Sequence, residues 1–225
     1  NELTVEVDNS VNDKVYPQKA DFTFYGGIYR DVDLIILNKN HFDMDHYGGN
    51  GLMITPVVDG LNGKVNVKTW NNCEGDVSVS LLDADGCVVA SGNGTHCDIT
   101  IENVHLWNGL DDPYLYSCKA VLSVDGNNVD EISAKFGVRS FRVDPKEGFF
   151  LNGKSYPLRG VCRHQDWKGI GNAITTEHHD TDMELIREVG ANTIRLAHYQ
   201  HDQYFYDLCD KYGMIVWAEI PYISE

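Results

Sequence analysis

The sequence predicts a multidomain fold that is β and then α/β: an immunoglobulin-like β-sandwich followed by the first βαβαβ portion of a (β/α)8 TIM barrel. Seven short apolar stretches separated by turn residues fill about 100 residues, which is typical of a sandwich. Beyond them, apolar strands alternate with stretches of helical period. That alternation is typical of a parallel sheet with crossover helices.

Residues 1–38 predict the end of a separate β domain that precedes the sandwich. Leu3, Val5 and Val7 alternate with polar residues, and residues 28–37 hold two more apolar stretches behind a Gly-Gly pair. Alternation of this kind is typical of half-buried strands. Because two or three strands are too few for a domain, we expect its earlier strands to lie before Asn1.

Residues 39–142 predict the sandwich itself. Asp-Gly, Asn-Gly and Gly-Asn-Gly turns separate the apolar stretches, and such turns favour hairpins. Trp107 lies between two of the stretches, and we expect it to pack in the core rather than to act in function. The expected strands are residues 52–58, 65–69, 77–82, 88–90, 99–101, 115–124 and 129–136.

Residues 143–225 predict the beginning of the barrel, with a hairpin at 149–154 and strands at 158–162, 192–197 and 214–218. Thr176 can cap a helix that runs through Val189, with Met183 and Ile186 on the same side as Val189. Asp202 can cap a second helix that ends at Gly213. The order is βαβαβ, with right-handed crossovers, and it supplies three of the eight strands of a barrel.

The acidic composition argues against nucleic acid as a partner. The formal net charge is −16 with a pI near 4.8, and no basic stripe offsets it. A neutral substrate fits better, since phosphate binding depends on clustered Lys and Arg. No apolar run approaches the roughly 18 residues of a membrane span. The six cysteines form no CxxC pair, so we expect reduced thiols, although a disulfide among Cys73, Cys87 and Cys97 remains open.

Two predicted strands end on histidine. Residues 158–164 end at His164 and residues 192–198 end at His198, and the rim of a barrel active site is built from such strand ends. A second histidine pair, His178 and His179, is adjacent on a predicted helix. Adjacent side chains on a helix project about 100° apart, unlike the i, i+4 pair of a zinc motif. We therefore expect these two in a solvated first turn rather than on a metal.

Seven motifs, in this order, resemble glycoside hydrolase family 2. They are Gly27-Ile-Tyr-Arg-Asp-Val32, Leu106-Trp107 with Pro113-Tyr-Leu-Tyr116, Phe136-Gly-Val-Arg139, Leu151-Asn-Gly-Lys154, Arg159-Gly-Val-Cys-Arg-His164, Asn192-Thr-Ile-Arg-Leu-Ala-His-Tyr199 and Trp217-Ala-Glu-Ile-Pro221. The resemblance implies an exo-acting retaining β-glycosidase in which residues 1–38 are the last strands of a sugar-binding jelly roll. The stretch 163–172 looks most like β-galactosidases.

The resemblance also implies roles for individual residues. His164 and His198 would hydrogen-bond sugar hydroxyls, because each imidazole nitrogen donates or accepts according to its tautomer. Arg195 would lie near the nucleophile carboxylate and keep it ionised, or form a structural ion pair. Asp21 would reach the sugar from the jelly roll, sometimes beside sodium, or be a solvated loop carboxylate. Glu219 would lie at the barrel mouth as a supporting or structural carboxylate. Arg195 and His198 differ in strand parity, so a regular strand would not direct both inward.

Retaining hydrolysis requires two carboxyl groups about 5 to 5.5 Å apart. The resemblance places the acid/base Glu after the fourth barrel strand and the nucleophile on the seventh, beyond Glu225, so we expect the chain alone to be inactive. A β-galactoside is the expected substrate. The alternatives are a β-glucuronidase or β-mannosidase of the same family, or a non-catalytic carbohydrate-binding or interaction module. No cofactor or metal site is evident in the residues, while the resemblance implies Mg or Na in a full-length enzyme and a homo-oligomer. The compartment stays open between cytoplasm, which is favoured, and periplasm or secretion.

Overall fold

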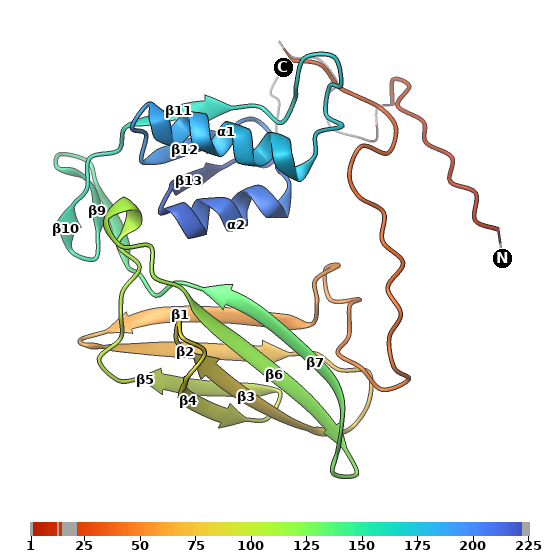
Figure 1. The fold of residues 1–225 in the computed structure, drawn as a ribbon, viewed down its shortest axis with the longest axis vertical. Coiled ribbons are helices and arrows are strands. Elements are labelled where there is room, and N and C mark those ends of the chain that lie inside the picture. The colour runs from red at the N-terminus through yellow and green to blue at the C-terminus, as the bar shows by residue number, and fades with distance from the viewer. Residues whose placement is uncertain (1, 13, 15–21, 222–225) are drawn as a thin grey trace. The chain divides into compact units, whose positions relative to one another are not determined.

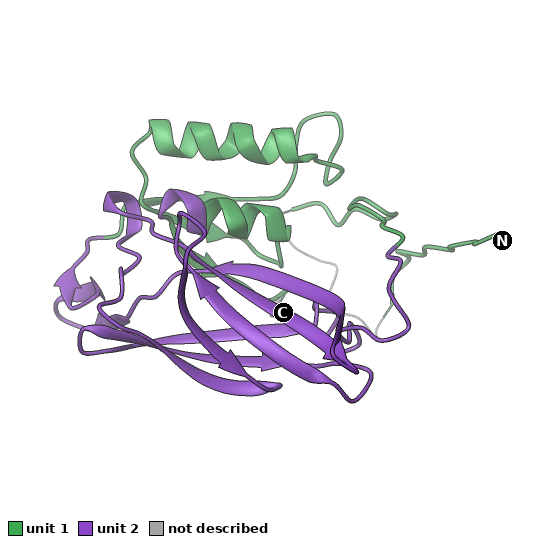
Figure 2. Ribbon diagram, turned by 60° about the horizontal axis from the view of Figure 1, so that its bottom comes forward, with its two compact units in different colours: residues 1–34, 158–209, 214–225 green, residues 35–157, 210–213 purple. Residues whose placement is uncertain are grey.

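The computed structural model describes residues 2–12, 14 and 22–221 of the chain. These residues belong to two compact units, which are coloured separately in Figure 2. One unit comprises residues 1–34, 158–209 and 214–225, and the other comprises residues 35–157 and 210–213. The described residues are rich in β-strands and contain two α-helices (Figure 1).

The unit of residues 35–157 and 210–213 contains the predicted sandwich. Its seven strands form two antiparallel sheets, so all seven strands predicted from residues 52–136 are confirmed (Figure 1). One sheet has the order β1-β2-β5, and the other has the order β4-β3-β6-β7. The strands are β1 (Leu52–Asp59), β2 (Asn62–Thr69), β3 (Asp76–Leu82), β4 (Val88–Asn93), β5 (His96–Ile101), β6 (Tyr116–Val124) and β7 (Asn127–Phe136).

The core of the sandwich lies between its two sheets. Alternate side chains of β3 and β6 are buried, among them Leu81 and Leu122, as the two-residue period of a strand requires. Trp107 is fully buried, as predicted from its position. A Cβ on Gly137 would lie 2.9 Å from the Trp107 side chain, so the backbone of residue 137 can approach the indole only as glycine.

A short meander follows the sandwich. The hairpin predicted at 149–154 is confirmed as β9 (Gly148–Leu151) and β10 (Lys154–Ser155), and β8 (Phe141–Asp144) pairs with the other edge of β9. The left-handed backbone of Asn152 and Gly153 makes the tight turn between β9 and β10.

The unit of residues 1–34, 158–209 and 214–225 contains most of the predicted βαβαβ segment, which is confirmed. The strands β11 (Gly160–Arg163), β12 (Thr193–Leu196) and β13 (Ile215–Ala218) form a parallel sheet in chain order. Helix α1 (Thr176–Glu188) connects the first two, and α2 (Gln203–Tyr212) connects the last two. The apolar run of β13 predicts cover on both faces, yet Trp217 is 68% exposed among the described residues.

Helix α1 corrects three predictions. Its N-cap is Thr175 rather than Thr176, and the His178 ring accepts a hydrogen bond from the Thr175 amide through Nδ1 at 3.1 Å. Val189 was expected on the buried side, but it is 71% exposed, while His179 was expected in solvent, but it is 2% exposed. The buried residues of α1 are His179, Met183 and Ile186. Val189 is not among them because it lies at the C-cap, where the helix ends.

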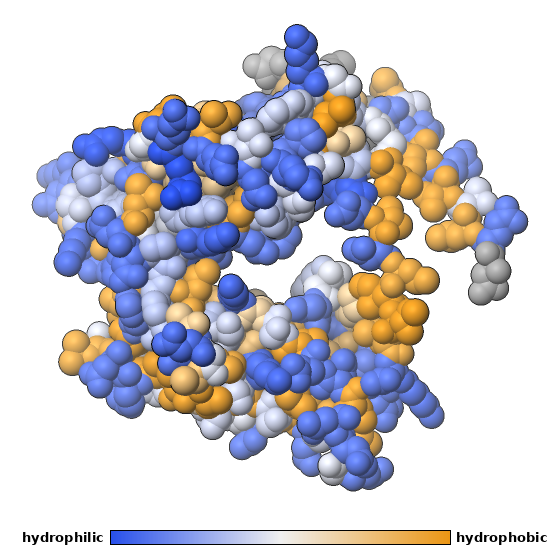
Figure 3. Space-filling model, in the orientation of Figure 1, coloured by the Kyte–Doolittle hydropathy of each residue, from blue (hydrophilic) through white to orange (hydrophobic). Residues whose placement is uncertain are grey.

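The strands predicted at 3–7 and in 28–37 are not formed. The described residues there are extended chain without a ladder, and Leu34 is 90% exposed. Exposed hydrophobic side chains follow this segment, which is the red and orange trace of Figure 1, in the space-filling view (Figure 3). Apolar alternation marks the face that a strand would bury, but a strand also requires a neighbour that accepts its hydrogen bonds.

Two of the composition-based expectations can be compared with the described residues. All six cysteines are free thiols, and burial raises the pKa of the Cys118 thiol to about 12. None of the helices in the described ranges is both long and apolar enough to span a membrane.

Candidate functional site

The parallel sheet brings three polar residues to one edge. His164 follows the last residue of β11, His198 comes two residues after the end of β12, and Glu219 follows the last residue of β13. The strand register pairs Arg163 with Leu196 and Leu196 with Ala218, so the three strands end level with one another. Carboxyl ends of parallel strands are where α/β proteins place their ligands.

Glu219 contacts two other predicted site residues: Arg195, which lies within β12, and His198, which lies just beyond the end of that strand. Its Oε1 atom accepts a hydrogen bond from Arg195 Nε at 2.5 Å, and its Oε2 atom lies 2.8 Å from His198 Nδ1. The Arg195 hydrogen bond is the main reason why the pKa of Glu219 is lowered, with a smaller contribution from His198. The same bond raises the pKa of Arg195. The carboxyl is therefore ionised in the neutral range.

These contacts determine the tautomer of His198. Nδ1 also lies 3.1 Å from Arg195 Nη2. Only one of the two contacts can be a hydrogen bond, because Nδ1 would have to accept from the guanidinium, which only donates, and also donate to the carboxylate. The shorter contact, to an ionised carboxylate, requires that Nδ1 carries the proton and donates it to Glu219. In this tautomer the Nε2 atom of His198 is the acceptor nitrogen of the ring. Strand parity does not separate Arg195 from His198, because β12 ends at Leu196; the Ala197–His198 peptide bond is cis.

His164 and His198 lie side by side, with ring centroids 5.2 Å apart in an edge-to-face arrangement. The Phe22 ring lies 5.4 Å from His164 and 5.5 Å from His198, and Tyr199 lies 5.6 Å from Phe22. The Nδ1 atom of His164 is buried and has no hydrogen-bond partner among the described residues. The two histidines are thus part of an aromatic cluster that retains unused hydrogen-bonding capacity.

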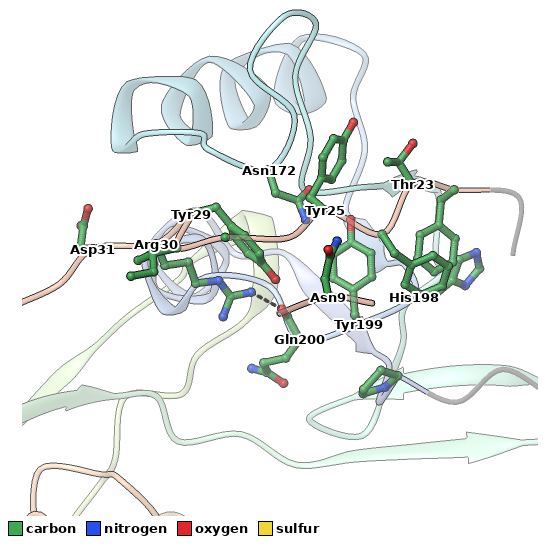
Figure 4. Close-up of a pocket in the computed structure, with 15 residues that line it drawn as sticks. Asn9, Thr23, Tyr25, Tyr29, Arg30, Asp31, Asn172, His198, Tyr199 and Gln200 are labelled. Carbon is green, nitrogen blue, oxygen red and sulfur yellow. Dashed lines mark hydrogen bonds between the residues drawn. The ribbon is translucent and has the colours of Figure 1, made fainter. Parts of the chain in front are cut away.

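A cavity of about 490 Å³ adjoins this cluster (Figure 4). His198 and Tyr199 line it from the loop after β12, and residues 22–31 and Asn172 line it from other segments of the same unit. The Arg30 guanidinium donates a hydrogen bond to the Gln200 carbonyl at 2.5 Å, which ties the two walls together. The Oδ1 atom of Asn172 is buried without a partner among the described residues. Aromatic walls with a few convergent polar groups are typical of small-ligand sites.

The structure does not place every predicted site residue. His164, His198, Arg195 and Glu219 come together, but Asp21 lies outside the described residues. The magnesium or sodium that the resemblance implies has no ligand set in the described part of the chain, where no three His, Cys, Asp or Glu side chains are grouped for a metal. Metal use therefore stays a prediction.

Sequence reasoning missed Phe22, Tyr199 and Asn172 as parts of this surface. Tyr199 directly follows His198, and Phe22 directly follows Asp21, so both neighbour residues that were singled out. Their aromatic type is compatible with an ordinary core, and only the spatial arrangement of residues distant in sequence identifies them. Asn172 had no signal in the sequence beyond its place in the stretch 163–172.

Two family models match the chain. Residues 50–139 match the model described as glycosyl hydrolases family 2, and residues 142–225 match that family's TIM barrel domain. Among curated relatives, a β-glucuronidase from Bacteroides fragilis is 37% identical over all of this chain and 34% of its own length. A β-galactosidase from Thermoanaerobacterium thermosulfurigenes is 32% identical over 98% of this chain and 32% of its own length.

Two solved structures that are similar to this chain also carry the names β-glucuronidase and β-galactosidase. The crystal structure of an FMN-binding β-glucuronidase from Facaelibacterium prausnitzii L2-6 has a TM-score of 0.91 and 47% identity, covering 95% of this chain and 34% of that one. A putative β-galactosidase from Bacteroides fragilis has a TM-score of 0.91 and 36% identity, covering 96% of this chain and 35% of that one. The chain spans about a third of the length of the relatives that it matches.

Proposed function

Because the chain belongs to glycosyl hydrolase family 2, we propose that the protein containing it is a retaining, exo-acting β-glycosidase. We further propose that this chain supplies part of the surface that binds the terminal sugar. The family relatives named above carry glycosidase names, and the site has hydrogen-bonding groups suited to hydroxyls rather than clustered cations suited to phosphate.

The convergence of His164 and His198 at the carboxyl edge of the parallel strands carries this proposal. His198 is held by Glu219 through Nδ1, so its Nε2 atom is left to bind a hydroxyl. A second hydroxyl would satisfy the buried Nδ1 atom of His164, which otherwise costs about 1–3 kcal/mol as an unpaired polar group. Phe22 and Tyr199 would provide the apolar surface that a sugar ring packs on.

Arg195 and Glu219 act on the sugar indirectly in this proposal. Glu219 orients the His198 ring, and Arg195 keeps Glu219 ionised so that it remains an acceptor. The Arg195 side chain is 43% exposed, so part of its guanidinium also remains available to a further carboxylate. The resemblance places the nucleophile carboxylate there. The two hydrolytic carboxyl groups themselves are not assigned to residues of this chain.

For the substrate we propose β-glucuronides first and β-galactosides second. The sequence favoured β-galactosides, but β-glucuronidases include relatives at 47% and 37% identity, against 36% and 32% for the β-galactosidases above. The β-glucuronidases and the β-galactosidases named above match nearly all of this chain. The order of the two proposed substrates therefore rests on sequence identity alone. None of the relatives named above is a β-mannosidase.

A substrate panel tests the proposed function. A polypeptide that contains this chain within the length of its relatives is assayed on 4-nitrophenyl β-D-glucuronide, β-D-galactoside and β-D-mannoside, with the α-D-glucuronide as a matched control. We expect kcat/KM to be highest on the β-glucuronide, no hydrolysis of the α anomer, and a β-configured first product by NMR. No hydrolysis of any β-glycoside, or an α-configured first product, would refute the proposal.

A further inference from the structure

A buried arginine, Arg163, joins the two histidine-bearing strand ends. Arg163 is the last residue of β11, directly before His164, and is 6% exposed. Its Nε and Nη2 atoms donate to Asp182 Oδ2 at 2.8 and 2.7 Å, and its guanidinium carbon lies 3.9 Å from the centre of the Phe205 ring. The remaining contacts of the guanidinium are to two buried histidines.

These two histidines must accept hydrogen bonds through Nδ1. Arg163 Nη1 lies 3.1 Å from His201 Nδ1, and Nη2 lies 3.0 Å from His179 Nδ1. A guanidinium has no acceptor, so each Nδ1 atom carries no proton and each ring is the neutral Nε2–H tautomer. Burial and the nearby Arg163 charge lower the pKa of His179. Burial above all lowers the pKa of His201 to about 4.

The tautomer of His201 leaves its Nε2–H as a donor, and that donor reaches the loop that carries His198. Nε2 lies 3.1 Å from the carbonyl oxygen of Ala197, the residue before His198. The Ala197 amide in turn donates to the Arg163 carbonyl at 3.0 Å. Both polar groups of Ala197 are thus held by Arg163 and its partner His201.

Gln165 ties the same loop from the other side of His164. Its amide donates to Tyr199 Oη at 3.1 Å, and its side-chain Oε1 accepts from the Asp202 amide at 2.6 Å. Gln165 is 1% exposed. The segments that carry His164 and His198 are therefore cross-linked by hydrogen bonds on both sides of each histidine, which fixes the separation of the two rings.

We propose that Arg163 and His201 are positioning residues for the sugar site: Arg163 fixes the tautomer of His201, and His201 holds His198 in place through the Ala197 carbonyl. This inference rests on the proposed function, because it assumes that His198 binds sugar. A displacement of about 1 Å at a binding group can lower the rate of an enzyme about a hundredfold, so a single backbone hydrogen bond can be functional at this place.

Two replacements of His201 separate its two hydrogen bonds. In His201→Gln the amide nitrogen can take the place of Nε2 and still donate to the Ala197 carbonyl. In His201→Asn the side-chain oxygen can take the place of Nδ1 and accept from Arg163, but the shorter side chain does not reach Ala197. His179→Asn is the matched control, since it retains an acceptor for Arg163, whereas the described hydrogen bond to the Ala197 carbonyl comes from His201.

The first readout is the ¹⁵N spectrum of the His198 imidazole in the wild type and the three variants. We expect the His198 resonances to shift or broaden in His201→Asn and to stay near the wild type in His201→Gln and His179→Asn. An unchanged His198 spectrum in a folded His201→Asn variant would overturn the proposal. The spectrum requires no turnover, so it tests the positioning role even if the proposed glycosidase activity fails.

The second readout is kcat/KM on the best β-glycoside of the panel. We expect a loss of at least about tenfold for His201→Asn, and values within about twofold of the wild type for His201→Gln and His179→Asn. A purely structural role would lower the melting temperature of His201→Asn and His179→Asn together and leave kcat/KM of the folded protein unchanged, which would contradict the assignment. His201→Phe, which removes both hydrogen bonds and keeps the ring, replaces His201→Asn if the latter does not fold, with the same expected loss.

Discussion

At the residue scale, Glu219 is bound on both oxygens and determines which nitrogen of His198 carries the proton. Arg195 and His198 each use one of its oxygens. The pair of contacts explains why residues of opposite strand parity can serve one site: the carboxylate from the end of β13 joins an arginine within β12 to a histidine beyond its end. The sequence contained all three residues, but the strand-parity rule applied to β12 could not reveal that they meet.

The pH dependence of stability tests this role of Glu219. Its pKa is lowered in the folded chain, so its ionised form is stabilised there. This stabilisation is present above 4.5, the ordinary pKa of a glutamate side chain, and is lost as the pH falls through the lower folded-state value. We therefore expect the melting temperature of Glu219→Gln to be lower than that of the wild type at neutral pH. The difference should shrink as the pH falls below 4.5.

Glu184→Gln is the control for this comparison, because it removes the same charge from an exposed position of α1. Its difference from the wild type should depend less on pH than that of Glu219→Gln. Equal differences for Glu219→Gln at about pH 7 and at about pH 3.5 would contradict the assignment of the ion pair. Melting curves followed by circular dichroism provide the measurement.

His179 shows why some of the buried residues could not be predicted. Its sequence neighbours are charged and polar, and a first helical turn with acidic residues is usually solvated. The partner that buries it, Arg163, lies 16 positions away on β11 and is itself a residue type that is rarely buried without partners. Only the pairing of two unusual residues makes either burial reasonable, and a periodicity analysis treats each segment by itself.

At the scale of elements, the sequence was most informative where neighbouring segments complete each other. The seven sandwich strands and the βαβαβ segment were predicted because their turns, caps and partners all lie within the chain. The cap of α2 is an example: Asp202 accepts a hydrogen bond from the Tyr204 amide at 2.9 Å, as its place before the helix predicts. The strands predicted at 3–7 and 28–37 failed because no described strand pairs with them.

Strand β3 allows a direct test of the sandwich core. Leu81 is fully buried, whereas Ser78 on the same strand is exposed. We expect Leu81→Ala to lower the free energy of unfolding by about 2–5 kcal/mol, since it removes buried methyl groups and leaves a cavity. Ser78→Ala should change it by less than about 0.5 kcal/mol. Urea unfolding of both variants measures this, and equal effects would show that β3 does not face the core as described.

At the scale of the whole molecule, the proposed sugar site is built from separate segments of one unit. The segments after β11, β12 and β13 supply the two histidines and Glu219, and His198 lines the cavity together with aromatic side chains from residues 22–31. The family could be predicted from seven ordered motifs and is confirmed by two family models. The preferred sugar could not be predicted, because relatives of both names match nearly the whole length of this chain.

The most direct test of a sugar site at the two histidine-bearing strand ends is kcat/KM for β-glycoside hydrolysis after His198 is replaced. In a polypeptide that contains this chain within the length of its relatives, His198→Phe keeps a ring and removes both nitrogens, and His96→Phe, on strand β5 of the sandwich, is the control. We expect kcat/KM to fall at least about tenfold for His198→Phe and to stay within about twofold of the wild type for the control. A folded His198→Phe variant with wild-type kcat/KM would contradict the assignment of this site.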